Sequence, residues 1–373
     1  MNAVPRPTPI PAGRGDVEAM RTTHELHVGD AAAMADVADE SVPLVVTSPP
    51  YPMIELWDDL FAARDPDVDA ALSAGDGDAA FELMHAQLDA VWDELDRVLA
   101  PGGIACINVG DATRSIGGEF QQFPNHARIV DALRARGLTP LPDVLWRKPT
   151  NSLAKFMGSG TLPPNAYVTL EHEYVLLFRK GGTRSFPPGD DTRYESAFFW
   201  EERNQWFSDL WEVRGEEQGA NGATERRDRS AAFPVEIPLR LIRMFSVRGD
   251  RVLDPFAGTG TTALAAMLAA RDSVGYDLDG DLFVALDDRV DGLPERSRRR
   301  VDERLARHRA AMADREGGYE AEHYDFRVVT KAERRIRLYA VSAVEAGTRT
   351  DGRRYLVDHD PVDGNDFTPG REG

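Results

Sequence analysis

The chain has 373 residues, 63 of them acidic and 44 basic, which gives a formal net charge of −19. This length allows a complete α/β core with a smaller second region. Cys106 is the only cysteine, which excludes internal disulfides and cysteine-rich zinc sites. No apolar segment is long enough to span a membrane, and the beginning lacks the apolar centre of a secretory signal. We therefore expect a protein of the reducing cytoplasm, without a membrane partner.

The first predicted strands lead to a proline-rich turn. Residues 1–22, rich in proline and glycine, predict a flexible leader, and residues 25–28 predict a strand. The apolar run at residues 42–46 predicts a buried strand. Because two prolines fix φ and remove backbone donors, this strand must end in a rigid, outward-facing turn. The turn follows Thr47 and reads Ser48-Pro49-Pro50-Tyr51.

The residue types of this turn suit chemistry at an exocyclic amine. Such an amine is a poor nucleophile because its lone pair is delocalised into the ring. The Ser48 hydroxyl and the Pro49 carbonyl could accept its hydrogens and orient it, and Tyr51 could offer a face on which the base stacks. The alternative is a proline-rich turn without chemistry, which the complete string after a buried strand disfavours.

The next elements are expected to build the core. Residues 58–80 are acidic and rich in alanine, which predicts a surface loop or a mobile lid. Residues 81–99 predict an amphipathic helix, and residues 124–136 predict a further helix. Residues 103–109 predict a buried strand in which Cys106 is inert. A cytosine-C5 reaction, which needs a nucleophilic thiolate, is therefore disfavoured.

Two irregular regions carry side chains of the kinds that contact nucleic acids. Residues 149–170 and 181–232 contain arginine, asparagine and glutamine, which read base edges. Residues 181–232 also contain aromatic rings, which support stacking on bases. Most of these rings are expected to form the core of that region instead.

Late in the chain, a glycine-rich turn connects a predicted strand with a predicted helix. Residues 251–254 predict the strand, residues 263–270 predict the helix, and Gly258 and Gly260 lie between them. Glycines at such a turn let the backbone approach a ligand at the N-terminus of the helix. A second strand ends at Asp277, whose carboxylate could accept from both hydroxyls of a ribose. An ordinary βαβ unit with a tight turn is the alternative.

The two motifs are expected to meet in space. In a doubly wound sheet, ligands lie beyond the carboxyl ends of the strands at the switch point, so the strands at 42–46 and 251–254 should be neighbours. With these motifs in this order, roughly residues 24–290 resemble the β-class amino-methyltransferases of DNA. The resemblance implies a circularly permuted, Rossmann-like α/β fold of the S-adenosylmethionine-dependent methyltransferases. It also implies an inserted target-recognition region and a C-terminal extension.

The resemblance assigns roles to individual residues. It implies a catalytic loop made of Ser48, Pro49, Pro50 and Tyr51. It implies that the cofactor, S-adenosylmethionine, is held by Asp30, Asp254, Phe256, Ala257, Gly258, Gly260 and Asp277. No metal is expected. Relatives usually carry His-Pro-Ala-Pro where this chain has Arg229-Ser230-Ala231-Ala232, a departure at the methionine end of the cofactor pocket.

Five parts are expected along the chain. They are a leader at 1–22, a catalytic half at 23–180, a target-recognition region at 181–232, a cofactor-binding half at 233–316 and a C-terminal extension at 317–373. Within the extension, alternation over residues 323–345 predicts a small added sheet, and residues 358–373 predict disorder.

The expected substrate is double-stranded DNA. Because Ser48 is commoner at this position among the cytosine-N4 enzymes, we expect N4 methylation of a flipped cytosine, with adenine N6 as the alternative. Similarity to standalone enzymes of salt-loving archaea implies a short palindromic site such as CTAG, with a cognate restriction endonuclease or none. Methylation of RNA or protein is disfavoured because those enzymes usually carry Asn-Pro-Pro-Tyr after the cofactor loop. A catalytically silent DNA-binding regulator is a further alternative. It is disfavoured because the catalytic loop and the cofactor loop are both intact.

The net charge is unexpected for a protein that binds DNA, which should carry a basic footprint. Only four of the basic residues are lysine, and an acidic, lysine-poor surface predicts adaptation to a salt-rich cytoplasm. Arginines cluster between residues 296 and 309. This run could contact DNA, or it could form a solvated helix face with ion pairs four residues apart.

Overall fold

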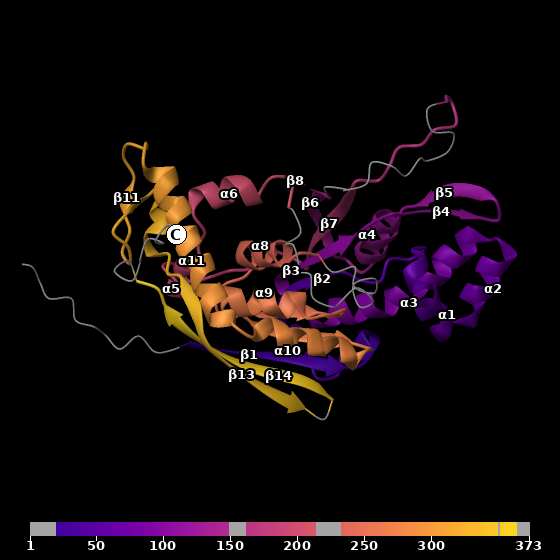
Figure 1. Ribbon diagram of the computed structural model, residues 1–373, viewed down its shortest axis with the longest axis horizontal. Helices are drawn as coiled ribbons and strands as arrows, with labels where there is room; N and C mark the ends of the chain where they lie inside the picture. Colours follow the sequence, from indigo (N-terminus) through magenta and orange to yellow (C-terminus); the bar gives the residue numbers. More distant parts are fainter. Residues whose placement is uncertain (1–19, 149–161, 214–232, 350, 364–373) are drawn as a thin grey trace, which may run out of the picture.

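The computed structural model describes residues 20–148, 162–213, 233–349 and 351–363. Its centre is a ten-stranded mixed sheet in the order β13-β14-β1-β10-β9-β2-β3-β7-β6-β8, with helices packed on both faces (Figure 1). The strands are β1 Met20–Val28, β2 Val42–Thr47, β3 Leu99–Val109, β6 Thr139–Arg147, β7 His172–Arg179, β8 Leu210–Trp211, β9 Arg251–Asp254, β10 Asp272–Asp277, β13 Tyr339–Arg349 and β14 Gly352–Pro361.

The sheet is parallel in its middle and antiparallel toward both sides. The neighbours β1, β10, β9, β2 and β3 run parallel, whereas β7 and β14 pair antiparallel with β3 and β1. Leu44 and Val45 of β2 pair with Val252 and Leu253 of β9. The predicted adjacency of the two motif-bearing strands is therefore confirmed, as is the α/β fold class.

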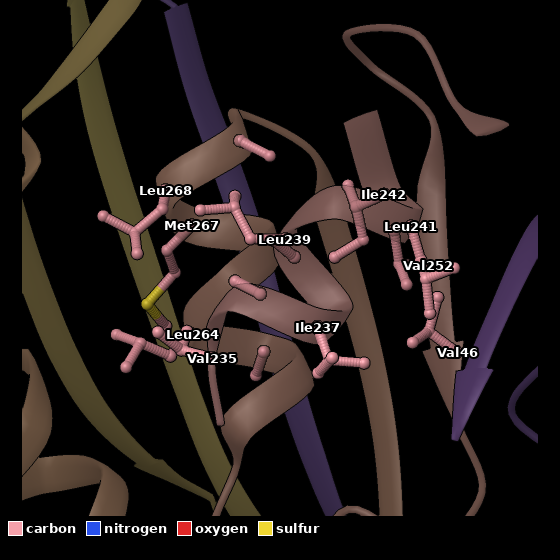
Figure 2. Close-up of a cluster of buried hydrophobic side chains, with 14 of the residues drawn as sticks. Val46, Val235, Ile237, Leu239, Leu241, Ile242, Val252, Leu264, Met267 and Leu268 are labelled. Carbon is pink, nitrogen blue, oxygen red and sulfur yellow. The ribbon is translucent and has the colours of Figure 1, made fainter. Parts of the chain in front are cut away.

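Side chains that alternate along the strands feed two separate hydrophobic clusters. In β2, Leu44 and Val46 belong to one cluster, while Val45 belongs to the other. Figure 2 shows part of the first, where α8 (Glu236–Phe245) and α9 (Thr261–Ala269) pack on the sheet. The second is covered by α3 (Gly77–Val98) and α4 (Asn125–Ala135). The central strands β2 and β9 are thus buried on both faces of the sheet, which explains their continuous apolar sequences.

Residues 58–80 are helical, so the prediction of a loop or lid was wrong. They form α1 (Asp58–Arg64), α2 (Pro66–Ala74) and the start of α3. Local signals explain the two breaks. The Asp65 side chain caps α2 ahead of Pro66 at its first position, and Gly75 ends α2 with a left-handed backbone at φ 76°. Acidic composition is compatible with a helix when the acids lie in first turns.

The C-terminal hairpin belongs to the main sheet and is not a separate small sheet. Strand β14 pairs antiparallel with β1 along most of its length, from Met20 opposite His359 to His27 opposite Gly352. Residues 358–361 are therefore ordered, and residues 20–22 belong to β1 and not to a leader. A separate two-stranded sheet, β11 (Tyr319–Glu320) with β12 (Arg327–Val328), lies beside it.

The described part of the expected target-recognition region is folded against the last helix of the cofactor-binding half and against the C-terminal extension. It contains α5 (Asp191–Glu195) and α6 (Trp200–Trp206), and Figure 1 shows α6 beside α11 (Leu293–Met312). Its rings Phe199 and Trp206 are buried, whereas Phe198 and Trp200 are half-buried and Phe207 is exposed, so the core interpretation holds for only some of them. The predictions that rest on residues 1–19, 149–161, 214–232 and 364–373 lie outside the described residues.

The remaining helices complete the layers on the sheet. They are α10 (Val284–Val290) and four short 3-10 helices, η1 (Ala31–Ala33), η2 (Glu55–Trp57), η3 (Gly280–Phe283) and η4 (Lys331–Arg335). A hairpin of β4 (Ala112–Ile116) and β5 (Glu119–Phe123) extends from the end of β3. Across the described ranges, none of the helices is long and apolar enough to cross a membrane.

Candidate active site

A cavity of about 650 Å³ opens at the carboxyl ends of β1, β2, β9 and β10. The structure gathers every predicted site residue around it except Tyr51 and Gly260. The predicted residues that line it are Asp30, Ser48, Pro49, Pro50, Asp254, Phe256, Ala257, Gly258 and Asp277. The helices that replace the predicted lid contribute Phe61 and Arg64 to the wall.

Asp254 joins the two motifs at the floor of this cavity. Its Oδ1 accepts a hydrogen bond from the Thr47 hydroxyl at 2.6 Å and another from the Phe256 amide at 3.1 Å. Burial raises the pKa of this carboxyl to about 6, because removal from water disfavours its charged form. The carboxylate therefore holds the end of β2 against the loop that follows β9.

Asp277 shapes the cofactor loop from the neighbouring strand. Its Oδ2 accepts from the Gly258 amide at 2.8 Å and its Oδ1 accepts from the Asp279 amide at 3.0 Å. Burial raises the pKa of this carboxyl as well. Each carboxylate oxygen has a second lone pair, so Asp277 can still accept from the hydroxyls of a ligand.

The two glycines of the loop serve different purposes. At Gly258, with φ 51°, a Cβ atom would have one neighbour, the Phe256 carbonyl at 4.0 Å, so the position is open toward the cavity. At Gly260, with φ 75°, a Cβ atom would lie 2.8 Å from Cδ2 of Leu286. Gly260 is thus required by the packing of α9 against α10. It does not line the cavity, and its predicted contact with the cofactor stays a prediction.

Asp30 stands at the rim of the cavity. It comes directly after Gly29, which follows the last residue of β1. Its Oδ1 accepts from the Ala32 amide at 3.0 Å, and its Oδ2 accepts from Nη2 of Arg64 at 2.7 Å. The side chain thus caps η1 and ties α1 to the rim. Phe256 also lines the cavity and contacts Trp92 edge to face, with ring centroids 6.3 Å apart.

Tyr51 does not offer the exposed stacking face that we expected. It is only 5 % exposed, and its ring belongs to the second hydrophobic cluster. Its hydroxyl lies 3.0 Å from the Ser48 hydroxyl and donates to Oε2 of Glu173 at 3.1 Å. The ring is therefore a support for Ser48 from behind and not part of the cavity wall.

Three polar residues behind Ser48 were missed as site residues. Asn108 and Glu173 are buried at the ends of β3 and β7, and Lys148 pairs with Glu173. For Asn108, the available signal was its placement in the apolar run 103–109, which the sequence itself predicts to be a buried strand. A buried charge needs a partner, and that partner lies far away in the sequence.

A different polar cluster lies outside this cavity. His27, Asp36 and Asp351 have potential ligand atoms within 4.8 Å of one another. None of the three lines the cavity. They are therefore not part of the candidate active site.

Comparison with known proteins agrees with this geometry. Residues 42–283 match the family model described as DNA methylase, N6_N4_Mtase. The chain is 49 % identical over 324 residues to the Type II methyltransferase M.MthZI of Methanothermobacter thermautotrophicus, covering 86 % of this chain and 91 % of the relative. It is 50 % identical over 280 residues to M.MjaI of Methanocaldococcus jannaschii, covering 72 % and 91 %.

Solved structures share the fold. TTHA0409 from Thermus thermophilus, in complex with S-adenosyl-L-methionine, has a TM-score of 0.55 and 33 % identity over 71 % of this chain and 92 % of that one. The PvuII DNA methyltransferase, described as cytosine-N4-specific, has a TM-score of 0.50 and 18 % identity, covering 71 % and 86 %. At that identity, the PvuII enzyme is evidence for the fold alone.

Proposed function

Because the chain belongs to the N6/N4 family of DNA methylases, we propose that it methylates the exocyclic N4 amine of a cytosine that is flipped out of a DNA duplex. S-adenosylmethionine is the cofactor. One observation carries this proposal. The pairing of β2 with β9 places Ser48, Pro49 and the loop from Asp254 to Gly258 on the same cavity.

The residues around the cavity fit this cofactor. Gly258 leaves room for close approach of a ligand, Asp277 offers lone pairs to ribose hydroxyls, and Asp30 offers a rim carboxylate at the end assigned to the adenine. When bound, S-adenosylmethionine supplies a methyl group activated by its sulfonium. The protein's part is to hold the acceptor amine in line with that group.

Ser48 and Pro49 are the residues that we assign to the amine. Both line the cavity, and their hydroxyl and carbonyl oxygens can accept the two amine hydrogens. Flipping a base costs a few kcal/mol, which contacts inside the pocket must offset. The reaction proceeds without a covalent enzyme intermediate. Cys106 is buried in β3, and burial raises the pKa of its thiol far above the usual range, so it does not serve as a thiolate nucleophile.

Nucleoside mass spectrometry tests the reaction and the base. Purified protein would be incubated with duplex DNA and labelled S-adenosylmethionine at high salt, because the charge of −19 favours a salt-rich environment. Labelled N4-methylcytosine is expected, and a Ser48→Ala variant should lose the product. Labelled N6-methyladenine would overturn the cytosine assignment while keeping the reaction class. Label in RNA alone would overturn the substrate class.

The recognition site and the partner form part of the same proposal. We expect a short palindrome such as CTAG, methylated either alongside a cognate restriction endonuclease or without one. Sequencing of the methylated DNA would read the site directly. A modified base in a sequence without two-fold symmetry would contradict the palindrome.

A further inference from the structure

A chain of buried hydrogen bonds leads from Ser48 away from the cavity. The Ser48 hydroxyl lies 3.0 Å from the Tyr51 hydroxyl, which donates to Oε2 of Glu173 at 3.1 Å. The Asn108 amide nitrogen donates to the same two acceptors, the Tyr51 oxygen at 2.8 Å and Oε2 of Glu173 at 2.6 Å. Lys148 pairs with the other oxygen of Glu173. These residues come from the catalytic loop, β3, β7 and the residue after β6.

The direction of the hydrogens follows from counting donors. The carboxylate of Glu173 only accepts, so the Asn108 side chain must present its NH2 group to it, and the Tyr51 O–H must point to it. The Tyr51 oxygen then has no hydrogen left for Ser48. The Ser48 O–H must therefore donate to Tyr51, which leaves the lone pairs of Ser48 Oγ free. Because Ser48 lines the cavity, a substrate N–H can donate to it.

Burial and charge set the direction in which a proton can move along these hydrogen bonds. Glu173 is 8 % exposed, and its two carboxylate oxygens contact the Lys148 ammonium and the Asn108 amide. Burial, together with the nearby Glu173 charge, raises the pKa of Tyr51 well above its usual range. Tyr51 is thus suited to pass a proton onward and unsuited to remain as a phenolate. The negative charge at the far end attracts positive charge that develops in the cavity.

On the basis of the function proposed above, we propose that Ser48, Tyr51 and Glu173 form a proton path that removes the proton released when the amine is methylated. As the nitrogen bonds to the methyl carbon and the carbon–sulfur bond breaks, the amine becomes cationic. While this charge develops, the amine gives one proton to Ser48 Oγ, Ser48 gives its proton to the Tyr51 oxygen, and Tyr51 gives its proton to Oε2 of Glu173. The products are a neutral methylated amine and a protonated Glu173, and neither hydroxyl changes its charge.

The path also explains how the site is restored. Lys148 is partly exposed, with 41 % of its side chain accessible, while Glu173 is enclosed. The protonated carboxyl returns its proton to water beside Lys148 after the product leaves. In this scheme Tyr51 acts through its hydroxyl, and Glu173 is a positioning residue and final proton acceptor that never touches the base.

Single-turnover kinetics of three variants test the path. Tyr51→Phe keeps the buried ring and removes the hydroxyl, Glu173→Gln keeps the shape and removes the acceptor, and Glu173→Asp keeps the charge on a shorter side chain. The matched control is Glu82→Gln. Glu82 lies on α3, is exposed and forms an ion pair with Arg128. The measured quantities are the methyl-transfer rate with labelled S-adenosylmethionine, the Kd values for cofactor and DNA, and the melting temperature.

We expect Tyr51→Phe and Glu173→Gln to slow methyl transfer by roughly 100-fold or more, the size of an acid–base contribution, with unchanged Kd values. Glu173→Asp should retain more activity than Glu173→Gln, and the control should match the wild type. A merely structural role would instead lower the melting temperature and weaken binding in all three variants, and that result would overturn the path. Wild-type rates in Tyr51→Phe or Glu173→Gln would also overturn it, while the proposed function would stand. A wild type that methylates no exocyclic amine would overturn both.

Discussion

At the residue scale, Asp254 is the point where the two halves of the site are joined. Its carboxylate accepts from Thr47 at the end of β2 and from the loop amide of Phe256, and it is almost fully buried. A buried carboxylate with neutral donors is stabilised by hydrogen bonds but disfavoured by the loss of water. The charged form of this carboxyl therefore lowers the free energy of unfolding, by an amount that depends on pH.

The pH dependence of stability tests this cost through Asp254→Asn. The folded pKa is about 6, and an ordinary unfolded aspartate titrates near ~3.9. Because the folded value is raised, the stabilising contribution is complete below ~pH 4 and is lost as pH rises through about 6. The free energy of unfolding of the wild type, minus that of the variant, should fall by on the order of 3 kcal/mol across this window.

Urea denaturation at closely spaced pH values measures that difference. Other titrating groups are common to both proteins, so their effects largely cancel. Parallel stability curves for wild type and variant would contradict the raised pKa of Asp254.

At the element scale, the turn from β9 to α9 shows that similar residues in one motif can have separate roles. Gly258 is open to the cavity, whereas Gly260 is confined by the Leu286 side chain of α10. Both have positive φ, which disfavours any other residue. The glycine-rich motif thus leaves one position open to the cavity and confines the other by helix packing.

Paired alanine variants separate these roles. Gly260→Ala should destabilise the fold by about 1–3 kcal/mol through overpacking, and this loss should be smaller in a Leu286→Ala background, where the clash is absent. Gly258→Ala should weaken cofactor binding more than it lowers stability. Denaturation and calorimetric titration with S-adenosylmethionine measure the two effects. Strict additivity of Gly260→Ala and Leu286→Ala would show that packing against Leu286 is not the constraint.

At the scale of the whole molecule, the C-terminal extension is part of the domain. β14 of the extension pairs with β1 at one side of the sheet. Ahead of the extension, α11 holds α6 through a buried ion pair between Arg304 and Glu202. Oε1 of Glu202 accepts from Nε of Arg304 at 2.5 Å, and Oε2 accepts from Nη2 at 2.7 Å. The described part of the region expected to recognise DNA is therefore anchored to a rigid support.

Removal of one partner from this pair should be costly. Glu202→Gln leaves the Arg304 guanidinium buried without its counter-charge, so we expect a loss of about 3–5 kcal/mol in the free energy of unfolding. The control is Glu322→Gln, whose partner Arg334 is exposed, and it should cost at most about 1 kcal/mol. Equal losses in the two variants, measured by urea denaturation, would contradict a structural role for the buried pair.

Much of the fold could be predicted because its signals are local. The apolar runs that became β2 and β9, the amphipathic pattern of α3 and the order of the two motifs each depend on neighbouring residues. Asp65, Pro66 and Gly75 also carry local signals, those that begin and end a helix. The prediction of a loop rested on the acidic composition and did not use these signals. Part of β13 was predicted as a strand but assigned to a separate small sheet, and β14 was missed, because pairing with β1 is a non-local property.

By itself, the sequence determined the class of fold, the two motifs and the residues that these motifs contribute to the cavity, because each motif carries its chemistry in consecutive residues. Only the tertiary structure decided that Gly260 faces Leu286, that Tyr51 is buried and that Asn108 and Glu173 lie behind Ser48. These contacts join residues from distant parts of the chain. Their geometry depends on how strands and helices pack, which no local pattern of residues specifies.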